Sequence, residues 1–514
     1  MRRAAVCVAA ALVLAPGLAV ALELSPEEVS GKRIFAEGIS GSGNAIYARV
    51  GAAGTSLPAA LLPCGSCHGA DGRGRPEGGV RPPDITWQRL SVPYGQRING
   101  RSYPAYDDAA LARAVIEGID PAGNRLDPAM PRFVLSVTEQ RDLTAYLKRL
   151  AEDRDPGVET ERLRLGTLLP VKGPQARLGH TVEAVLRGGL QQINAAGGIH
   201  GRQLELLVVD PGADAASASA ALQRLLEQEQ IFALVAPLLP TVDGRFSELL
   251  KRSRVPLIGP LSFLGDQERN PHVFEVLPGL REQLLALGRF ASQELETGEA
   301  LILYQDNKAF AKLAALLAEQ LERQGWSKVR QQVYTGQAES VAGSAADALF
   351  FLGNETAFAL LGGALQGASR PPSLLAVSSQ VAGSVLQLPT SFAGKVFLAY
   401  PFIPADWTQE GTTALARVRE QAGLTSEHML LQVSAFATIQ VLAEGLRRAG
   451  RDASRRGLVT GLESLHGFRT GLTPVLEYGP GQRVGAAGAH IVQVDIAARR
   501  FSPVGGYLRL QRDW

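Results

Sequence analysis

Apolar and polar positions follow two different patterns along this chain of 514 residues. In the first part, apolar positions recur at helical spacing over 107–115 and 135–150, with Asp107, Ser136 or Thr138 available as helix caps. Beyond residue 162, short apolar runs alternate with longer helical patterns. Alternation of this kind predicts parallel sheets covered by helices on both faces.

The second part divides again at the break formed by Pro278 and Gly279. Its roughly 350 residues exceed a single hydrophobic core, so we expect two α/β lobes. The segments expected as helices are 182–193, 309–321 and 430–446, and those expected as strands are 163–169, 204–209, 231–235, 255–258, 300–304, 348–352, 374–377 and 396–400.

The boundary between the two parts is a charged stretch with proline and glycine. We expect domains at 24–152 and 162–514, joined by a linker at 153–161 that is long enough to leave them independent. The net charge of +2, with both signs interspersed, argues against a nucleic-acid partner.

The N-terminus has the features of a secretory signal peptide at 1–21. Met1–Arg3 is positively charged, the segment 4–20 is apolar, and Ala19-Val20-Ala21 offers a small-residue cleavage site. We therefore expect a periplasmic protein, with an uncleaved membrane anchor as the alternative. Cleavage would leave Cys64 and Cys67 as the remaining cysteines.

Cys64-Gly65-Ser66-Cys67-His68 is the most informative motif. Two thiols in C-x-x-C spacing, followed directly by histidine, predict covalent attachment of one c-type haem. Each thiol forms a thioether with a haem vinyl group, and His68 becomes the proximal iron ligand. A redox dithiol or half of a zinc site is the alternative.

Elimination identifies the sixth iron ligand as Met130. His68 is the only histidine before residue 180, and Met130 is the only methionine between the signal peptide and residue 428. A His/Met pair is the ligation of electron-transfer cytochromes. Alternatively, Met130 packs in the core and the sixth position is open. We expect no enzyme, because no catalytic constellation is present and Met130 would occupy the sixth coordination position of the iron.

Residues 24–152 resemble a class I cytochrome c. The resemblance rests on Gly31 and Phe35 in the first helix, the motif at 64–68 and the last helix at 135–150. It implies an all-α domain whose exposed haem edge docks a redox partner. It also makes Trp87, Tyr94 and Arg101 candidates for haem propionate contacts, with packing or surface roles as the alternative.

The second part resembles the type I periplasmic binding proteins, the leucine/isoleucine/valine-binding family of ABC importers. The strongest motif is Ile193–Arg202, and further matches lie at 166–170, 256–260, 467–471 and 478–481. The glycines of the strongest motif report a turn and not a binding site. The resemblance covers 162 to about 510 and implies a cleft between two lobes that close on a small ligand.

Positions after the carboxyl ends of the strands are candidates for the ligand cleft. They are Thr241, Ser262, Phe263, Phe310, Ser379, Gln380 and Tyr400. Where amino-acid binders of the family have serines, this chain has Leu238-Leu239-Pro240, and the loop 378–381 offers no acid. An unpaired ammonium in a closed cleft is costly, so we expect a neutral or apolar ligand and not an α-amino acid.

These features lead to two functional hypotheses. The first is a periplasmic electron-transfer cytochrome c with a fused small-molecule-binding domain, serving a redox chain with a periplasmic dehydrogenase, by resemblance one with a quinone cofactor. The alternative is the substrate-binding component of an ABC importer, with an ABC permease as partner and an accessory cytochrome domain. They differ in whether haem redox state and ligand affinity are linked.

Overall fold

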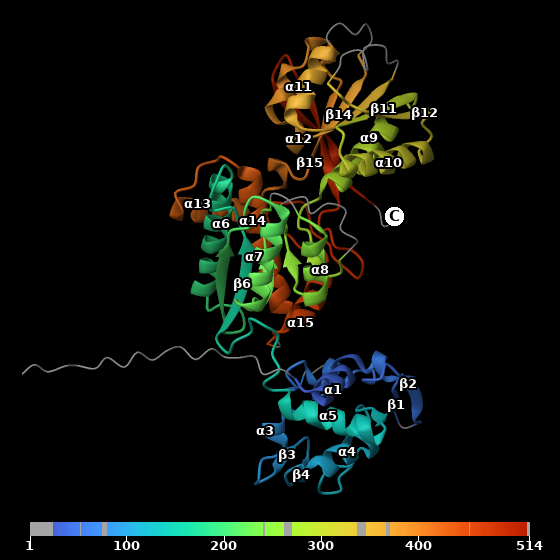
Figure 1. Ribbon diagram of the computed structural model, residues 1–514, viewed down its shortest axis with the longest axis vertical. Helices are drawn as coiled ribbons and strands as arrows, with labels where there is room; N and C mark the ends of the chain where they lie inside the picture. The colour runs from blue at the N-terminus through green and yellow to red at the C-terminus, as the bar shows by residue number, and fades with distance from the viewer. Residues whose placement is uncertain are drawn as a thin grey trace, which may run out of the picture. The chain divides into compact units, whose positions relative to one another are not determined.

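A computed structural model describes residues 24–510, except for 52, 75–79, 240–241, 262–269, 337–345, 366–370 and 452. The expected signal peptide at 1–21 lies outside the described residues. The chain forms two compact units, Met1–Arg154 and Asp155–Trp514 (Figure 1). The division falls inside the segment 153–161.

The N-terminal unit is built around two helices, α1 (Pro26–Glu37) and α5 (Val137–Arg149). They pack closely because Gly31 has no side chain: a Cβ there would lie 2.0 Å from the carbonyl oxygen of Asp142. The rings of Phe35 and Tyr146 meet beside this contact, with centroids 5.6 Å apart. Shorter helices complete the unit: α2 (Cys64–His68), α3 (Trp87–Leu90) and α4 (Asp108–Glu117).

The expectation of an all-α domain is wrong, because this unit also contains strands. β1 (Tyr47–Val50) pairs antiparallel with both β2 (Thr55–Pro58) and β5 (Arg132–Val134), and β3 (Gln96–Ile98) forms a hairpin with β4 (Arg101–Tyr103). These segments form strands because buried and exposed side chains alternate over three or four residues. In the first sheet one face buries Ala48 and Phe133, while Tyr47 and Val134 on the other face are exposed.

The turns that follow α1 and α4 share one construction. The segments 38–45 and 118–125 both begin with a glycine in the left-handed region, at φ 68° and 71°. Each is closed by one antiparallel bridge, Ile39 with Ala45 and Ile119 with Arg125. Glycine at a helix C-cap allows this reversal at no steric cost. The second of these turns leads into the loop that carries Met130.

The first lobe of the C-terminal unit contains a parallel five-stranded sheet in the order β10-β9-β8-β6-β7. Its strands are β6 (Arg162–Leu168), β7 (Gln203–Val209), β8 (Ala233–Val235), β9 (Leu257–Ile258) and β10 (Val273–Phe274). Its helices are α6 (Ala176–Ala195), α7 (Ala215–Glu227), α8 (Gly244–Ser253), α13 (Gln409–Gln421), α14 (Met429–Ala449) and α15 (Arg455–Glu463) (Figure 1).

The second lobe contains a seven-stranded sheet in the order β12-β11-β13-β14-β15-β16-β17. The strands β11 (Glu299–Tyr304), β12 (Lys328–Val333), β13 (Ala348–Leu352), β14 (Ser373–Val377) and β15 (Val396–Tyr400) are parallel, and β16 (Gly488–Asp495) and β17 (Arg500–Arg509) are antiparallel. Its helices are α9 (Leu280–Glu294), α10 (Lys308–Arg323), α11 (Glu355–Ala364) and α12 (Ser378–Val381). The expected bilobed α/β fold is confirmed.

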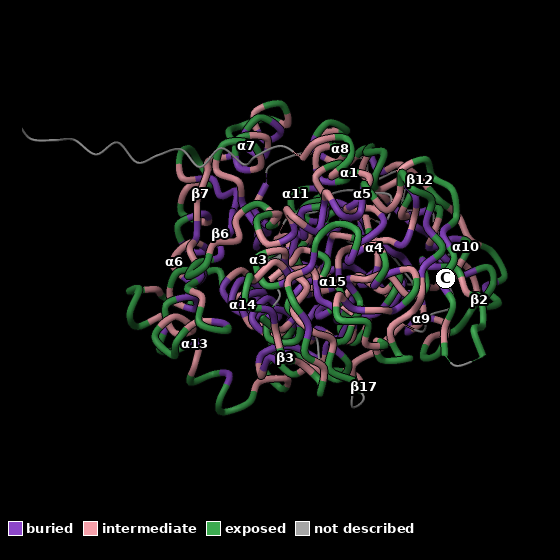
Figure 2. The backbone as a smooth tube through the Cα atoms, turned by 90° about the horizontal axis from the view of Figure 1, so that it is seen from below, coloured by how far each residue is buried: buried purple, intermediate pink, exposed green. Residues whose placement is uncertain are grey.

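The chain passes between the two lobes at 277–280, 399–402 and 486–489. At each passage the residue on one side packs in the core of the first lobe and the residue on the other side in the core of the second. Helix α14 is long and apolar enough to cross a membrane by length and composition. Most of it is buried in the first lobe, as Figure 2 shows, so core packing accounts for its apolar residues.

The segment 153–161 is anchored at both ends. The carboxylate of Asp153 accepts hydrogen bonds from Lys32 Nζ and Tyr146 Oη, both at 2.8 Å, within the N-terminal unit. Asp155 accepts from the Arg455 backbone amide at 2.6 Å, and the Glu159 carbonyl accepts from Arg202 Nε at 3.1 Å, within the C-terminal unit. These hydrogen bonds assign Asp153 to the N-terminal unit, and Asp155 and Glu159 to the C-terminal unit.

Candidate functional site

The motif Cys64–His68 forms the short helix α2, which follows Pro63. Both thiols are free; Cys64 is half-buried and Cys67 is exposed. Burial raises the pKa of the Cys64 thiol to about 12, so this thiol stays protonated at neutral pH. A zinc ligand or a redox dithiol requires a thiolate, and this environment disfavours one.

The His68 side chain is oriented for metal ligation. The ring is only 7% exposed, and Nδ1 lies 3.1 Å from the carbonyl oxygen of Pro83. Because a carbonyl can only accept, Nδ1 carries the proton, and Nε2 is left with its lone pair. Burial lowers the pKa of His68, which favours this neutral form. Such a second hydrogen bond is what fixes a ligating histidine in proteins.

Met130 lies in the loop between α4 and β5 and is half-buried. Its amide donates to the Asp127 carbonyl at 3.1 Å, and its carbonyl accepts from the Arg132 guanidinium. The residues that a haem c would need, Cys64, Cys67, His68 and Met130, all belong to this unit. Within the described ranges, no group of three or more His, Cys, Asp or Glu side chains is placed to hold a metal ion.

The three candidates for propionate contacts have different environments. Arg101 forms an ion pair at 2.8 Å with Asp120, whose side chain is fully buried. Trp87 is half-buried, with Lys148 Nζ 4.9 Å from its ring centre. Tyr94 is 86% exposed. Arg101 therefore already compensates a buried carboxylate, which supports the packing alternative for this residue.

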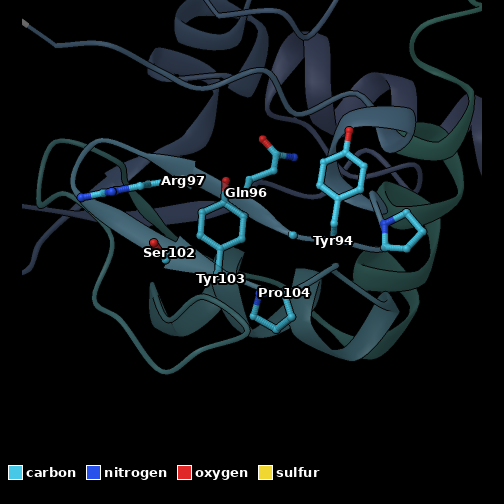
Figure 3. A pocket seen from close by; sticks show the side chains of 8 residues that line it. Tyr94, Gln96, Arg97, Ser102, Tyr103 and Pro104 are labelled. Atoms are coloured by element: carbon cyan, nitrogen blue, oxygen red, sulfur yellow. The ribbon is translucent and has the colours of Figure 1, made fainter.

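Tyr94 lies in an open groove of about 600 Å³ along the β3–β4 hairpin (Figure 3). The groove is lined by Pro93, Tyr94, Gly95, Gln96, Arg97, Ser102, Tyr103 and Pro104. The sequence analysis missed it because it missed the hairpin. The available signal was the Asn99-Gly100 pair between two short polar-apolar runs, a strong indicator of a hairpin turn.

The second lobe brings four of the candidate cleft residues to one edge of its sheet. β11, β14 and β15 are parallel and end at Tyr304, Val377 and Tyr400. Phe310 lies in the first turn of α10, after β11, and Ser379 and Gln380 lie in α12, directly after β14. These positions therefore follow carboxyl ends at the same edge, where ligands of α/β proteins bind.

Two of these side chains have polar groups available at that edge. Gln380 Oε1 is buried and has no hydrogen-bond partner among the described residues. Tyr400 is half-buried, and burial raises the pKa of its phenol, so the hydroxyl is a neutral donor. Ser379 is exposed and Phe310 is half-buried against the core of the lobe. This edge can offer neutral hydrogen bonds and an aromatic surface.

The candidate cleft residues of the first lobe, Thr241, Ser262 and Phe263, lie outside the described residues. Asp210, a carboxylate at the end of β7, is already engaged. Its oxygens accept from the amides of Val171 at 3.1 Å and Gly212 at 2.8 Å. Asp210 thus shapes its loop, with one hydrogen bond accepted by each carboxylate oxygen.

The motif Ile193–Arg202 has a structural role. Asn194 forms two hydrogen bonds with Leu204 of β7, donating from Nδ2 at 3.0 Å and accepting at Oδ1 at 2.8 Å. Gly198 has φ 72°, and a Cβ there would lie 2.1 Å from the Arg202 carbonyl oxygen. The turn connects α6 to β7 and requires glycine.

A buried His–Asp pair was missed by the sequence analysis. His490 Nε2 lies 3.0 Å from both carboxylate oxygens of Asp406, and His490 is 6% exposed. His490 is also the cross-strand partner of Tyr400, so the pair lies beside two passages between the lobes. The two residues are 84 positions apart, and no local pattern in the sequence joins them.

Comparison with known proteins identifies the family. A model of the periplasmic binding proteins matches residues 162–499, and the chain belongs to this family. The family implies a periplasmic or extracellular location. The match covers both lobes and leaves the N-terminal unit unmatched.

Among curated proteins, the chain is similar to the chemotactic signal transduction system substrate-binding protein BasB of Halobacterium salinarum. The two are 26% identical over 195 residues, 36% of this chain and 46% of the relative, so the chain spans just under half the length of that relative.

Solved structures share the fold of the C-terminal unit. One is a putative branched-chain amino acid ABC transporter protein from Rhodospirillum rubrum, with a TM-score of 0.56 and 17% identity over 67% of this chain and 100% of its own. Another is a branched-chain amino acid ABC transporter protein from Thermus thermophilus with bound valine, with a TM-score of 0.54 and 15% identity over 69% and 97%. At these identities the likeness concerns the fold.

Proposed function

We propose that the C-terminal unit captures a small molecule between its two lobes, as the substrate-binding component of an ABC importer does. The observation that carries the proposal is the family match over 162–499, which spans both lobes. A bilobed fold with several passages between the lobes is suited to closure on a ligand. An ABC permease would then be the partner that accepts the loaded protein.

The proposed ligand is a neutral or largely apolar small molecule and not an α-amino acid. The Thermus thermophilus protein of this fold holds valine, whose ammonium group requires a negative partner. In this chain α12 has the sequence Ser-Ser-Gln-Val, and Asp210 is engaged by backbone amides. Gln380 Oε1 instead suits a neutral donor, such as a hydroxyl or amide, and Phe310 suits an apolar group.

We propose further that the N-terminal unit carries one haem c. Cys64 and Cys67 would hold it through thioethers, with His68 and Met130 as the iron ligands. Bound haem would supply reversible one-electron chemistry, and the protonated Nδ1 of His68, bonded to Pro83, would hold the proximal ligand in place. The carrying observation is this neutral histidine, hydrogen-bonded to Pro83 and directly following the Cys64–Cys67 pair.

This proposal gives neither unit a catalytic role. A protein with a closed iron exchanges electrons with a redox partner, and a periplasmic dehydrogenase with a quinone cofactor is the partner we propose. Residues 1–21 would direct the chain to the periplasm, where both thioether formation and such a partner occur.

A redox titration of the full chain tests the two proposals together. The protein is expressed with a haem c maturation system, and covalent haem is measured by denaturing gel and by the alkaline pyridine spectrum. A panel of alcohols, aldehydes, organic acids and amino acids is screened by calorimetry, and each ligand that binds is added to the titration.

Each result has a definite meaning. Protein without covalent haem would refute the cytochrome proposal, and binding of branched-chain amino acids alone would refute the proposed ligand class. A ligand that shifts the midpoint potential favours a redox role for binding, because linkage between sites is reciprocal. Binding with an unchanged midpoint favours the ABC-importer role with an accessory cytochrome.

A further inference from the structure

The loop that carries Met130 is held mainly by bonds to its own backbone. The Leu126 amide donates to the Gly118 carbonyl at 2.8 Å, and the Met130 amide donates to the Asp127 carbonyl at 3.1 Å. These bonds shape the loop internally. They do not connect the segment 126–130 to the sheet.

Arg132 connects the segment 126–130 to β5. Its Nη2 donates to the carbonyl oxygens of Leu126 at 3.0 Å and Asp127 at 3.2 Å, and its Nη1 donates to the carbonyl oxygen of Met130 itself. A planar guanidinium with five donors can bridge several carbonyls at once. A lysine ammonium is a compact point charge and lacks this fork geometry.

The fold provides a place for this guanidinium at Gly118. A Cβ at Gly118 would lie 1.8 Å from Arg132 Nε, so the absence of a side chain there is required. The backbone of Arg132 is fixed separately, because Arg132 in β5 pairs with Arg49 in β1. The backbone of Arg132 is thus held in the sheet, its side chain lies against Gly118, and its guanidinium binds the loop carbonyls.

The same sheet joins the segments of the two proposed iron ligands. β1 pairs on its other edge with β2, and β2 leads through a short 3₁₀ turn at Ala59–Leu61 into α2, which carries His68. β5 begins two residues after Met130. The sheet therefore connects the segment that carries His68 with the segment that carries Met130. Arg132 is the residue of this sheet that contacts the Met130 loop.

We infer that Arg132 is the positioning residue that holds the loop in the conformation in which Met130 presents its sulfur to the haem iron. This inference rests on the proposed haem ligation. Arg132 acts through the loop carbonyls and has no contact with the iron in this role.

The test compares Arg132→Gln and Arg132→Lys with Met130→Ala as the reference for a lost ligand. Arg49→Gln, an exposed arginine paired with Arg132 across the sheet, is the matched control. The readouts are the sulfur-to-iron charge-transfer band of the ferric protein and its affinity for imidazole. Because haem is held covalently by Cys64 and Cys67, loss of the band would not reflect loss of haem.

We expect Arg132→Gln to weaken the band and to raise imidazole affinity about 10–100-fold, the usual effect of removing an outer partner of a metal ligand. Arg132→Lys should fall between Arg132→Gln and wild type, and Arg49→Gln should match wild type. In the haem-free chain, hydrogen exchange of the amides at 126–130 should accelerate in Arg132→Gln and stay unchanged in Arg49→Gln.

A full band and wild-type imidazole affinity in Arg132→Gln would overturn the inference and leave Met130 ligation standing. A wild-type protein that lacks the band and binds imidazole as tightly as Met130→Ala would overturn the ligation and the inference with it. If Arg132→Gln does not fold, Arg132→Lys decides: a band and imidazole affinity equal to wild type would overturn the inference, and an intermediate value would support it.

Discussion

The role of Met130 is tested by replacing this one side chain. Met130→Ala removes the methionine sulfur, a ligand that stabilises reduced haem iron, so the midpoint potential should fall. We expect a fall on the order of 0.1 V or more, within the ~0.8 V over which axial ligands set haem potentials. The measurement is a spectroscopic redox titration, and Met429→Ala, in α14 of the other unit, is the control.

The alternative role of Met130 predicts a different result. If Met130 only fills space in the core, Met130→Ala lowers the thermal stability of the N-terminal unit and leaves the potential and the spectrum unchanged. An unchanged potential would therefore exclude Met130 as the ligand.

Single residues differ in how far the sequence reveals them. Cys64, Cys67 and His68 stand out in the sequence because the motif that they form consists of adjacent positions. Arg132 and the His490–Asp406 pair were not, because their roles depend on partners that folding brings together. Arginines are frequent in this chain, and nothing in the sequence shows that Arg132 bridges three carbonyls.

At the level of elements, the cap of α5 can be tested directly. Either Ser136 or Thr138 could cap this helix by sequence. In the structure Ser136 is the N-cap: its hydroxyl accepts from the Glu139 amide at 3.3 Å, and Glu139 Oε2 accepts from the Ser136 amide at 2.8 Å. Ser136→Ala should cost about 1 kcal/mol of unfolding free energy, the usual cost of losing a cap.

Thr138→Ala is the matched control, because Thr138 is exposed in the first turn of the same helix. Its effect should stay within about 0.5 kcal/mol. Chemical denaturation of the full chain, followed by haem absorbance to report the N-terminal unit, measures both variants. A larger loss for Thr138→Ala than for Ser136→Ala would contradict the assignment of the cap.

Strands formed by continuous apolar runs could be predicted from the sequence, and the short strands of the N-terminal unit could not. The runs 348–352 and 396–400 are the strands β13 and β15, and 309–321 lies inside α10. The strands of the N-terminal unit have three or four residues, too few for alternation to be distinguished from loop sequence. Their pairing with distant segments, β1 with β5, supplies the stability that the local pattern lacks.

The candidate ligand cleft could also be predicted only in part from the sequence. Topology placed Phe310, Gln380 and Tyr400 at one edge of a sheet, because parallel strands end together. The unpartnered oxygen of Gln380 depends on side-chain packing, which no pattern of apolar positions contains. The sequence could therefore locate the edge, and could not supply its hydrogen-bond geometry.

At the scale of the whole C-terminal unit, the half-buried acid Glu275 lies two residues before the first passage between the lobes. The Glu275 amide donates to the Arg483 carbonyl and the Glu275 carbonyl accepts from Tyr478 Oη, so the backbone is fixed on the first lobe. Beyond the passage, Glu282 of α9 caps its own helix through the Gly279 amide and contacts Arg281. Two carboxyl groups thus lie close together where the chain leaves the first lobe.

This arrangement makes stability depend on pH. Burial, together with the negative charge of Glu282, raises the pKa of Glu275 from 4.5 to about 8, while Arg281 opposes the shift. Folding therefore favours the protonated carboxyl, and this contribution is complete below pH 4.5 and is lost as the pH rises through about 8. Glu275→Gln keeps the neutral form at every pH. Its melting temperature should match wild type below pH 4.5 and exceed it above pH 8.

Glu248→Gln, an exposed acid of α8 in the same lobe, separates this effect from a general loss of negative charge. Its melting temperature should stay close to that of wild type, because substitutions of exposed residues usually change stability little. Scanning calorimetry of wild type and both variants across this pH range is the measurement. A Glu275→Gln protein that is less stable than wild type above pH 8 would mean that the ionised carboxylate contributes favourably to the passage. The acid would then stabilise the connection between the lobes through Arg281, and the like charge of Glu282 would be the minor influence.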